Sequence, residues 1–138
     1  MANSVLADVN VCLDLLLDRH PFAEHSGQIF ERAEQGKLTV VVSGLSFDTL
    51  FYIMRPAIGV PKATQLLQEF SHNVTVGTVN QSVVHNALQA GWKDLEDALQ
   101  YYCAIEAKCN AVVTRNVPDF TPARETIRVL TPEQFLNQ

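Results

Sequence analysis

The stretch DLEDALQYYCAIEAKCNAVVTRNVPDF, residues 94–120, holds the pattern that decides the fold. From Asp94 to Lys108, apolar residues recur at helical spacing, which predicts a strongly apolar helix. The run from Ala111 to Thr114 is short, continuous and rich in valine, as expected for a strand buried on both faces of a parallel sheet. A buried helix that leads directly into a buried strand favours a mixed α/β domain. The residues on the apolar face of the helix are Leu95, Ala98, Leu99, Tyr102 and Ile105.

The same alternation of strands and helices runs along the rest of the chain. Further strands are predicted at Ser4–Ala7, Leu38–Val42, Val74–Val79 and Ile127–Leu130. Further helices are predicted at about Val11–Asp18, Phe22–Gln35, Leu45–Met54, Pro61–Phe70 and Gln81–Ala90, with a last one opening at Thr131. Strands separated by helices imply right-handed crossovers, so we expect a three-layer α/β/α sandwich with a mainly parallel central sheet.

Local signals set several expected helix ends. Gly36 and Gly91 are predicted to end helices because glycine adopts positive φ at low cost. Arg55-Pro56 is predicted to end the helix that begins near Leu45, since proline has no amide hydrogen to donate. Thr131-Pro132-Glu133-Gln134 has the pattern of a capping box, with a threonine cap and a glutamine that reaches back to it.

Composition limits both the domain count and the partners. The chain has 138 residues, of which 47% are hydrophobic and 18% are charged, and it shows no internal repeat or Gly/Ser-rich linker. These values predict one folded domain over residues 1–138 and exclude disordered and low-complexity classes. The formal net charge of −5 leaves no broad basic face for holding duplex DNA nonspecifically, so any nucleic-acid contact must be local.

Cysteine usage and the first residues indicate a compartment. The three cysteines, Cys12, Cys103 and Cys109, have no CxxC spacing, which argues against a disulfide framework and a zinc site and predicts buried free thiols. The first twenty residues lack a basic leader, and Asp8 and Asp14 interrupt their apolar stretch, so they predict neither a signal peptide nor a membrane span. We therefore expect a cytoplasmic protein with no membrane association.

Polar residues collect where the predicted strands end. Because the carboxyl ends of parallel strands meet at one sheet edge, these side chains are expected to lie close together. Clustered carboxylates repel one another, and a divalent cation between them relieves that repulsion. Carboxylate oxygens suit Mg²⁺ or Mn²⁺, so the pattern points to metal-assisted attack on a phosphodiester. The residues in question are Asp8, Asn10, Ser43, Asp94, Glu96, Asp97, Asn116 and Asp119, with Arg115 as a candidate for holding a substrate phosphate.

Structural interpretations of the same residues remain open. Asp94 with Asp97 three residues later also fits a helix cap with a first-turn acid. Asp119 after a proline fits a turn, and Asp8 at a strand end fits an Asx turn. Arg115 fits a solvated loop as well as a phosphate contact. For aromatic residues such as Trp92, Tyr101 and Tyr102, core packing competes with base stacking and is favoured.

At this point the chain resembles the PIN domain, a metal-dependent ribonuclease fold that includes the VapC-type toxins of toxin–antitoxin pairs. The opening LADVNVCLDLLLDRHPF, residues 6–22, looks like the family's strand–Asp–x–Asn–helix motif. The segment 94–120 looks like its closing motif, and VLTPEQFL, residues 129–136, is similar to its usual end. The resemblance covers nearly the whole chain, and the closing segment is its most specific part.

The resemblance implies a metal site and a function. It makes Asp8 the first metal-binding acid, Asp97 the third, and Asp119 or Asn116 the variable fourth, with Asn10 and Thr114 in support. The implied activity is Mg²⁺- or Mn²⁺-dependent cleavage of single-stranded or loop RNA. The implied partners are an RNA substrate, an antitoxin protein and a second copy of the chain in a homodimer.

The chain departs from the family at the second acid, which lies early in the helix after the second strand. The sequence there is VVSGLSFDTLFYIM, residues 41–54, and the register puts Thr49 at the acidic position. Asp48 is one residue away, a rotation of about 100° around a helix. Asp48 is therefore a candidate metal ligand whose reach is open, and a catalytically inactive PIN-like binding module is the alternative function.

A third function class follows from the first acidic motif. Asp8-Val9-Asn10-Val11 resembles the DxDx motif of haloacid-dehalogenase-type phosphatases. Asn10 stands where those enzymes carry the acid that protonates the leaving group, and the chain is short for their core plus cap. These two features make a phosphatase the weakest of the three hypotheses.

Overall fold

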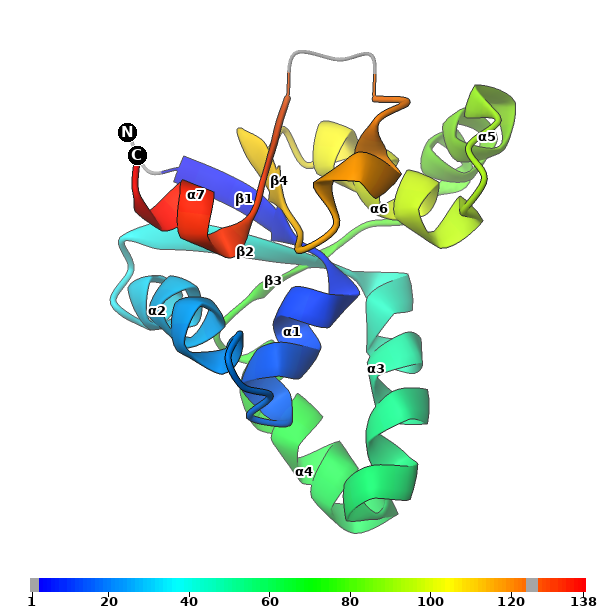
Figure 1. Ribbon diagram of the computed structural model, residues 1–138. Coiled ribbons are helices and arrows are strands. Elements are labelled where there is room, and N and C mark those ends of the chain that lie inside the picture. Colours follow the sequence, from blue (N-terminus) through cyan, green and yellow to red (C-terminus); the bar gives the residue numbers. More distant parts are fainter. Residues whose placement is uncertain (1–2, 124–126) are drawn as a thin grey trace.

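The computed structural model describes residues 3–123 and 127–138, and its centre is a parallel sheet (Figure 1). Within these residues the sheet has five strands in the order β3-β2-β1-β4-β5, and every adjacent pair is parallel. This agrees with the predicted mainly parallel sheet. The strands are β1 (Asn3–Ala7), β2 (Leu38–Ser43), β3 (Thr75–Gly77), β4 (Ala111–Val113) and β5 (Arg128–Leu130).

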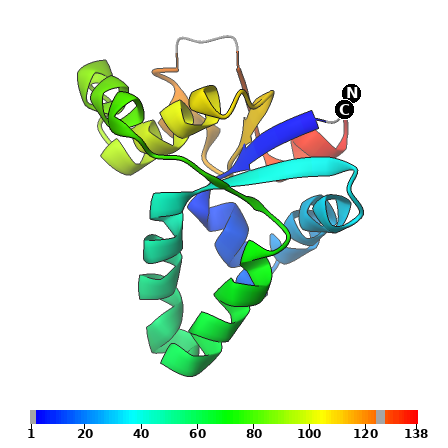
Figure 2. The same cartoon turned by 180° about the vertical axis from the view of Figure 1, so that it is seen from behind.

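Helices cover both faces of the sheet, as Figures 1 and 2 show from opposite sides. One face packs against α1, α2, α3, α4 and α7, and the other packs against α5, α6 and a 3₁₀ helix, η1. The predicted three-layer α/β/α sandwich is therefore confirmed. The bounds are α1 (Val9–Leu16), α2 (Ala23–Glu34), α3 (Gly44–Ile58), α4 (Val60–Ser71), α5 (Gln81–Ala90), α6 (Leu95–Glu106), η1 (Val117–Phe120) and α7 (Pro132–Leu136).

Alternation along the strands explains why both faces are apolar. In β1, Val5 and Ala7 join the core under α1 to α4, whereas Leu6 between them joins the core under α6. Val41 in β2 and Val112 in β4 share the second face with Leu6. Successive side chains point to opposite faces of a strand, so a strand covered on both sides must be apolar at every position.

The helix after β2 is longer than predicted. The expected end at Arg55-Pro56 is wrong, because α3 continues through Pro56 to Ile58. Pro56 lies in the last turn, where its missing amide costs one backbone hydrogen bond and leaves the earlier turns intact. The helix stops at Gly59, whose φ is +84° and whose amide donates to the Arg55 carbonyl at 2.8 Å.

Other helix ends follow the sequence signals. Gly36 and Gly91 adopt φ of +73° and +70°, as predicted for residues that end helices. The capping box is confirmed, because the Gln134 amide donates to Thr131 Oγ1 at 3.1 Å and the Thr131 amide donates to Gln134 Oε1 at 3.0 Å. The first helix begins at Val9, two residues before its predicted start, because Asp8 in extended backbone is its N-cap.

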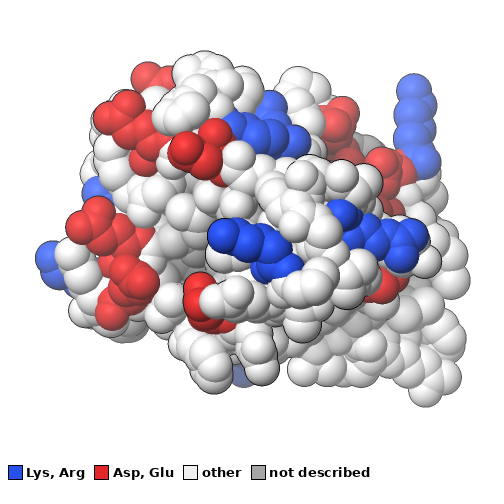
Figure 3. Space-filling view, turned by 90° about the horizontal axis from the view of Figure 1, so that it is seen from below, with Lys and Arg blue, Asp and Glu red and all other residues white. Residues whose placement is uncertain are grey.

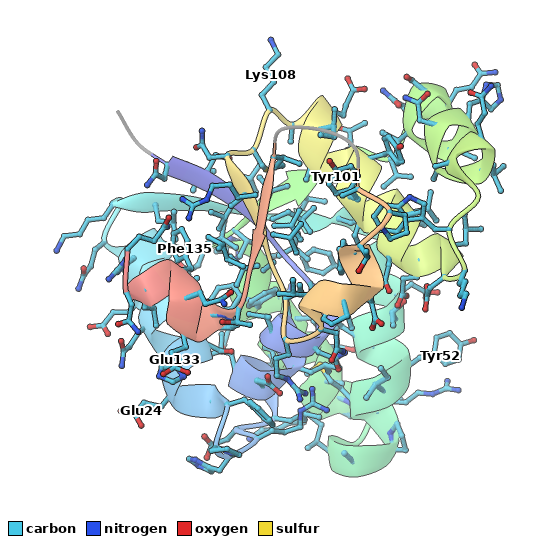
Figure 4. The ribbon with its side chains drawn as sticks, turned by 45° about the horizontal axis from the view of Figure 1, so that its top comes forward. Glu24, Tyr52, Tyr101, Lys108, Glu133 and Phe135 are labelled. Atoms are coloured by element: carbon cyan, nitrogen blue, oxygen red, sulfur yellow. The ribbon has the colours of Figure 1, made fainter. Side chains whose placement is uncertain are left out.

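The buried residues match two further expectations. All three cysteines are free and buried. Tyr101 is fully buried among aromatic rings, with Trp92 and Tyr102 each 5.3 Å away between ring centroids, which confirms the core-packing interpretation for Tyr101. Figure 4 shows Tyr101 of α6 inside the molecule, whereas Tyr52 extends outward from α3.

Charges on the surface are mixed. On the face shown in Figure 3, basic and acidic side chains are interspersed and form no continuous basic area. None of the described helices is long and apolar enough to span a membrane. The face in Figure 3 therefore offers no broad basic area for holding duplex DNA.

Candidate functional site

The carboxyl ends of β1 and β4 bring Asp8 next to Thr114. Ala7 lies opposite Val113 in the sheet, and the Asp8 amide donates to the Val113 carbonyl at 3.0 Å. Thr114 then donates its hydroxyl proton to Asp8 Oδ2 at 2.7 Å and accepts from the Asn116 amide at 3.1 Å. Parallel strand ends therefore place the first expected acid and its expected supporting threonine in direct contact.

Gln100 of α6 holds the other oxygen of the same carboxylate. Its Nε2 donates to Asp8 Oδ1 at 2.9 Å, and its Oε1 accepts from the Val9 amide at 3.1 Å. Gln100 is only 1% exposed. Both Asp8 oxygens are thus held by neutral donors, and the first amide of α1 is satisfied at the same time.

The sequence analysis did not include Gln100 among the candidate site residues. One feature of the sequence could have indicated it: Gln100 is a polar residue among apolar ones in the predicted helix, one turn after Asp97. A buried amide is uncommon and is normally fully hydrogen-bonded, so such a residue predicts a specific partner. The sequence did not indicate that this partner is Asp8, 92 positions away.

Asp8, Asp97 and Asp119 interact electrostatically at this edge of the sheet. Burial raises the pKa of Asp8, and the charge of Asp119 raises it further, against the hydrogen bonds from Thr114 and Gln100. Burial is also the largest cause that raises the pKa of Asp97 to about 7, followed by the charges of Asp8, Asp94, Asp119 and Glu96. The expected first, third and fourth acids are therefore near enough to oppose one another's ionisation.

Asp97 and Asp119 face a shared cleft of about 390 Å³. Asp94 also lines this cleft and caps α6, with its Oδ1 accepting from the Asp97 amide at 3.1 Å. The capping interpretation of Asp94 is thus confirmed. Within the described parts of the chain, no three His, Cys, Asp or Glu residues are gathered tightly enough to hold a metal by themselves. The cleft is lined by Lys93, Asp94, Asp97, Pro118, Asp119, Thr121 and Pro122.

Thr49, which stands at the expected position of the second acid in α3, makes a contact with another helix. Thr49 donates its hydroxyl proton to Glu96 Oε2 at 2.8 Å, which links α3 to the start of α6. Asp48 is exposed and forms no hydrogen bond or ion pair with another described residue. All three residues line a second cleft of about 300 Å³, which Gln100 also lines.

Arg115 and Asn10 make contacts away from Asp8. Arg115 Nε lies 2.8 Å from Asp14 Oδ2 as an ion pair, its Nη2 donates to Asp14 Oδ1 at 3.2 Å, and its guanidinium stacks 3.9 Å from the Phe22 ring centre. The Asn10 side-chain oxygen accepts from Arg19 at 3.3 Å, and Arg19 also pairs with Asp14 at 2.9 Å. The fully buried Asp14 is therefore the centre of a second polar network, which the sequence analysis missed.

Comparisons with known proteins show which family the chain resembles. A family model described as PIN domain matches residues 4–118. Ribonuclease VapC1 of Aquifex aeolicus (strain VF5) is 25% identical over 139 residues, which cover 97% of this chain and 94% of that protein.

Two solved structures share the fold. Mycobacterium tuberculosis VapC20, described as a sarcin–ricin loop cleaving toxin, superposes with a TM-score of 0.68 and 12% identity over 90% of this chain and 98% of that one. A toxin–antitoxin complex from Klebsiella pneumoniae superposes with a TM-score of 0.68 and 19% identity over 93% of this chain and 97% of that one. The matched family model spans most of the sequence, including most of β1 and all of β2, β3 and β4, and the chain belongs to the PIN domain family.

Proposed function

We propose that this protein is a divalent-metal-dependent endoribonuclease and the toxin component of a toxin–antitoxin pair. The observation that carries the proposal is the Asp8 carboxylate, which Thr114 and Gln100 fix at the strand ends among the charges of Asp97 and Asp119. Membership of the PIN domain family and a curated relative named as a ribonuclease support it.

The donor set fits Mg²⁺ or Mn²⁺. Asp8, Asp97 and Asp119 offer carboxylate oxygens only, which these hard cations prefer over nitrogen or sulfur. Mg²⁺ is usually held by one or two protein carboxylates and keeps several water ligands, so a tight cage of three acids is not required. Asp8 and Asp97 would hold the ion, and Asp119 lines the same cleft as Asp97.

The roles of the residues follow from their contacts. Thr114 and Gln100 keep both Asp8 oxygens in fixed positions, so little reorientation is needed when a cation binds. Asp97, with its pKa raised to about 7, gives up its proton readily when positive charge arrives. Lys93 is the basic residue of the cleft and is placed to contact a substrate phosphate. When bound, a divalent cation supplies an activated water and stabilises the charge on the phosphodiester.

We further propose single-stranded or loop RNA as the substrate. The net charge of −5 and the mixed surface in Figure 3 disfavour a long duplex, whereas splayed bases of loops allow selective recognition with few phosphate contacts. The fold neighbours described as a sarcin–ricin loop cleaving toxin and as a toxin–antitoxin complex support a loop substrate and an antitoxin partner. A homodimer is proposed from the resemblance to the family alone.

The test is cleavage of labelled single-stranded and hairpin RNAs with Mg²⁺, with Mn²⁺ and with a chelator. Wild type is expected to cleave only with metal, and Asp8→Asn and Asp97→Asn are expected to lose cleavage while remaining folded. Asp18→Asn is the matched control, because Asp18 is an exposed aspartate just beyond α1. Cleavage that persists in chelator, or that survives in both site variants, would contradict the proposal.

A second function remains a candidate because Thr49 stands where the family carries its second acid. In that case the chain is a PIN-like module that binds RNA or protein without cleaving it. This module would bind an RNA in the same panel, leave it intact, and show no Mn²⁺ binding that depends on Asp8.

A further inference from the structure

α3 lacks a carboxylate at the position of the family's second acid, where this chain has Thr49. A carboxylate does lie at this place, because Thr49 Oγ1 donates to Glu96 Oε2 at 2.8 Å. The two residues are 47 positions apart, so the contact depends on how α3 packs beside the start of α6. Glu96 of α6 therefore brings a carboxylate into contact with the residue of α3 that stands at the family's acidic position.

We propose that Glu96 replaces the missing acid of α3 as a ligand-supplying residue of the divalent-metal site, with Thr49 holding its carboxylate in position. This inference rests on the proposed nuclease function and deepens it. It assigns a site role to a residue that the family's usual set of acids does not include.

The surroundings of Glu96 connect it to Asp8. Glu96 and Gln100 are four residues apart on α6 and therefore lie on the same side of that helix, where both line the second cleft. Gln100 Nε2 in turn contacts Asp8 Oδ1 at 2.9 Å. The Gln100 side chain therefore connects the cleft lined by Glu96 to the Asp8 carboxylate.

Glu96 also has a carboxylate oxygen available to bind a cation. It is exposed, its Oε2 is fixed by Thr49, and its Oε1 accepts no hydrogen bond from the described residues. A carboxylate with one oxygen anchored and one open loses less side-chain freedom on binding a cation than an unanchored one. Asp48 is the competing candidate, and it has no comparable anchor.

The experiment is a Mn²⁺ titration of the full chain followed by electron paramagnetic resonance, with circular dichroism to verify folding. Glu96→Gln keeps an oxygen for the Thr49 hydrogen bond, so the fold is expected to survive. Its Mn²⁺ affinity is expected to fall about tenfold or more. Glu106→Gln, an exposed glutamate at the other end of α6, is the matched control and is expected to bind like wild type.

A transfer variant separates ligation from a structural role. In Thr49→Glu combined with Glu96→Gln, the carboxylate moves back to α3, and Mn²⁺ affinity is expected to recover to within a few-fold of wild type. A merely structural role of the Thr49–Glu96 hydrogen bond predicts no recovery, because the double variant lacks the threonine hydroxyl that donates it.

The outcomes distinguish this inference from the proposed function. Wild-type affinity in Glu96→Gln, or a loss in Asp48→Asn alone, would overturn the role of Glu96 while Asp8→Asn still abolishes binding. If Asp8→Asn binds Mn²⁺ as wild type does, or if wild type binds none, the metal site itself fails and both proposals are overturned.

Discussion

The Gln100 amide joins the Asp8 carboxylate to the first turn of α1, and both of its contacts are buried. In Gln100→Leu, one carboxylate oxygen and the Val9 amide lose their partners, and each unsatisfied buried group costs about 1–3 kcal/mol. We therefore expect the free energy of unfolding to fall by at least this amount in a denaturant titration. Gln89→Leu, at an exposed position of α5, is the control, and an equal loss there would contradict the role of Gln100.

Asp97 makes stability depend on pH in a predictable direction. Its pKa in the folded chain is about 7 against an ordinary 3.8, so between these values the folded chain keeps a proton that the unfolded chain releases. The contribution of Asp97 to the free energy of unfolding therefore falls as pH rises from about 4 to about 7. Asp97→Asn cannot ionise, so its melting temperature relative to wild type is expected to be higher at pH 8 than at pH 5. A difference independent of pH would show that the Asp97 pKa is not raised.

A variant of Arg115 tests whether this residue stabilises the fold or holds a substrate phosphate. It pairs with the buried Asp14 carboxylate, and its side chain is 25% exposed. Breaking a buried ion pair by removing one partner typically costs about 3–5 kcal/mol, and the partial exposure and the second partner Arg19 reduce this. We expect Arg115→Ala to lower the melting temperature. A stable variant that cleaves RNA poorly would instead assign Arg115 to phosphate binding.

Residues that directly follow strands can be placed from the sequence, whereas contacts between distant elements cannot. Asp8 and Thr114 were predictable as neighbours, because each directly follows a buried strand and parallel strands end at one edge. The contacts made by Gln100 and Glu96 were not, because they depend on the packing of α6 beside β1 and α3. The position of Arg115 was predictable, but its partner on α1 was not.

At the scale of the elements, Gly77 sets how closely β3 approaches α6. A Cβ added at Gly77 would lie 2.5 Å from Cys103 Sγ and 2.8 Å from Val41 Cγ1, both in the core between the sheet and α6. Overpacking of this kind typically costs about 1–3 kcal/mol. We expect Gly77→Ala to lower the free energy of unfolding by this amount in a denaturant titration. Gly27→Ala is the control, since nothing lies within 4 Å of a Cβ there, and an equal loss would contradict the argument.

Elements were predictable to the extent that local signals decide them. The buried valine runs and the glycine, proline and threonine caps gave the order of strands and helices, because those preferences act within a few residues. The prediction that Pro56 ends its helix is wrong, because a proline in the last turn of α3 costs little. The packing of α3 against α4, which extend together from the sheet in Figures 1 and 2, supports that last turn from outside the local sequence.

At the scale of the whole molecule, the fold gathers Asp8, Asp97 and Asp119 at one edge of the sheet, where their charges oppose one another. A divalent cation bound there, as proposed above, would remove this repulsion in the folded chain and would have no equivalent site in the unfolded one. At a concentration 100 times its Kd, such a ligand stabilises the fold by about 2.7 kcal/mol. For a chain of this size, we expect Mn²⁺ to raise the melting temperature by on the order of 10 °C.

If Mn²⁺ binds at the proposed site, the rise in melting temperature depends on Asp8. Asp8→Asn is expected to melt at the same temperature with and without Mn²⁺, whereas Asp18→Asn keeps the wild-type shift and a chelator reverses it. Scanning calorimetry across a series of Mn²⁺ concentrations measures both effects, because stabilisation through one site grows with the logarithm of the ion concentration above Kd. An identical shift in Asp8→Asn would mean that the ion binds to other surface acids, and the sheet edge would then be an acidic cleft without a metal site.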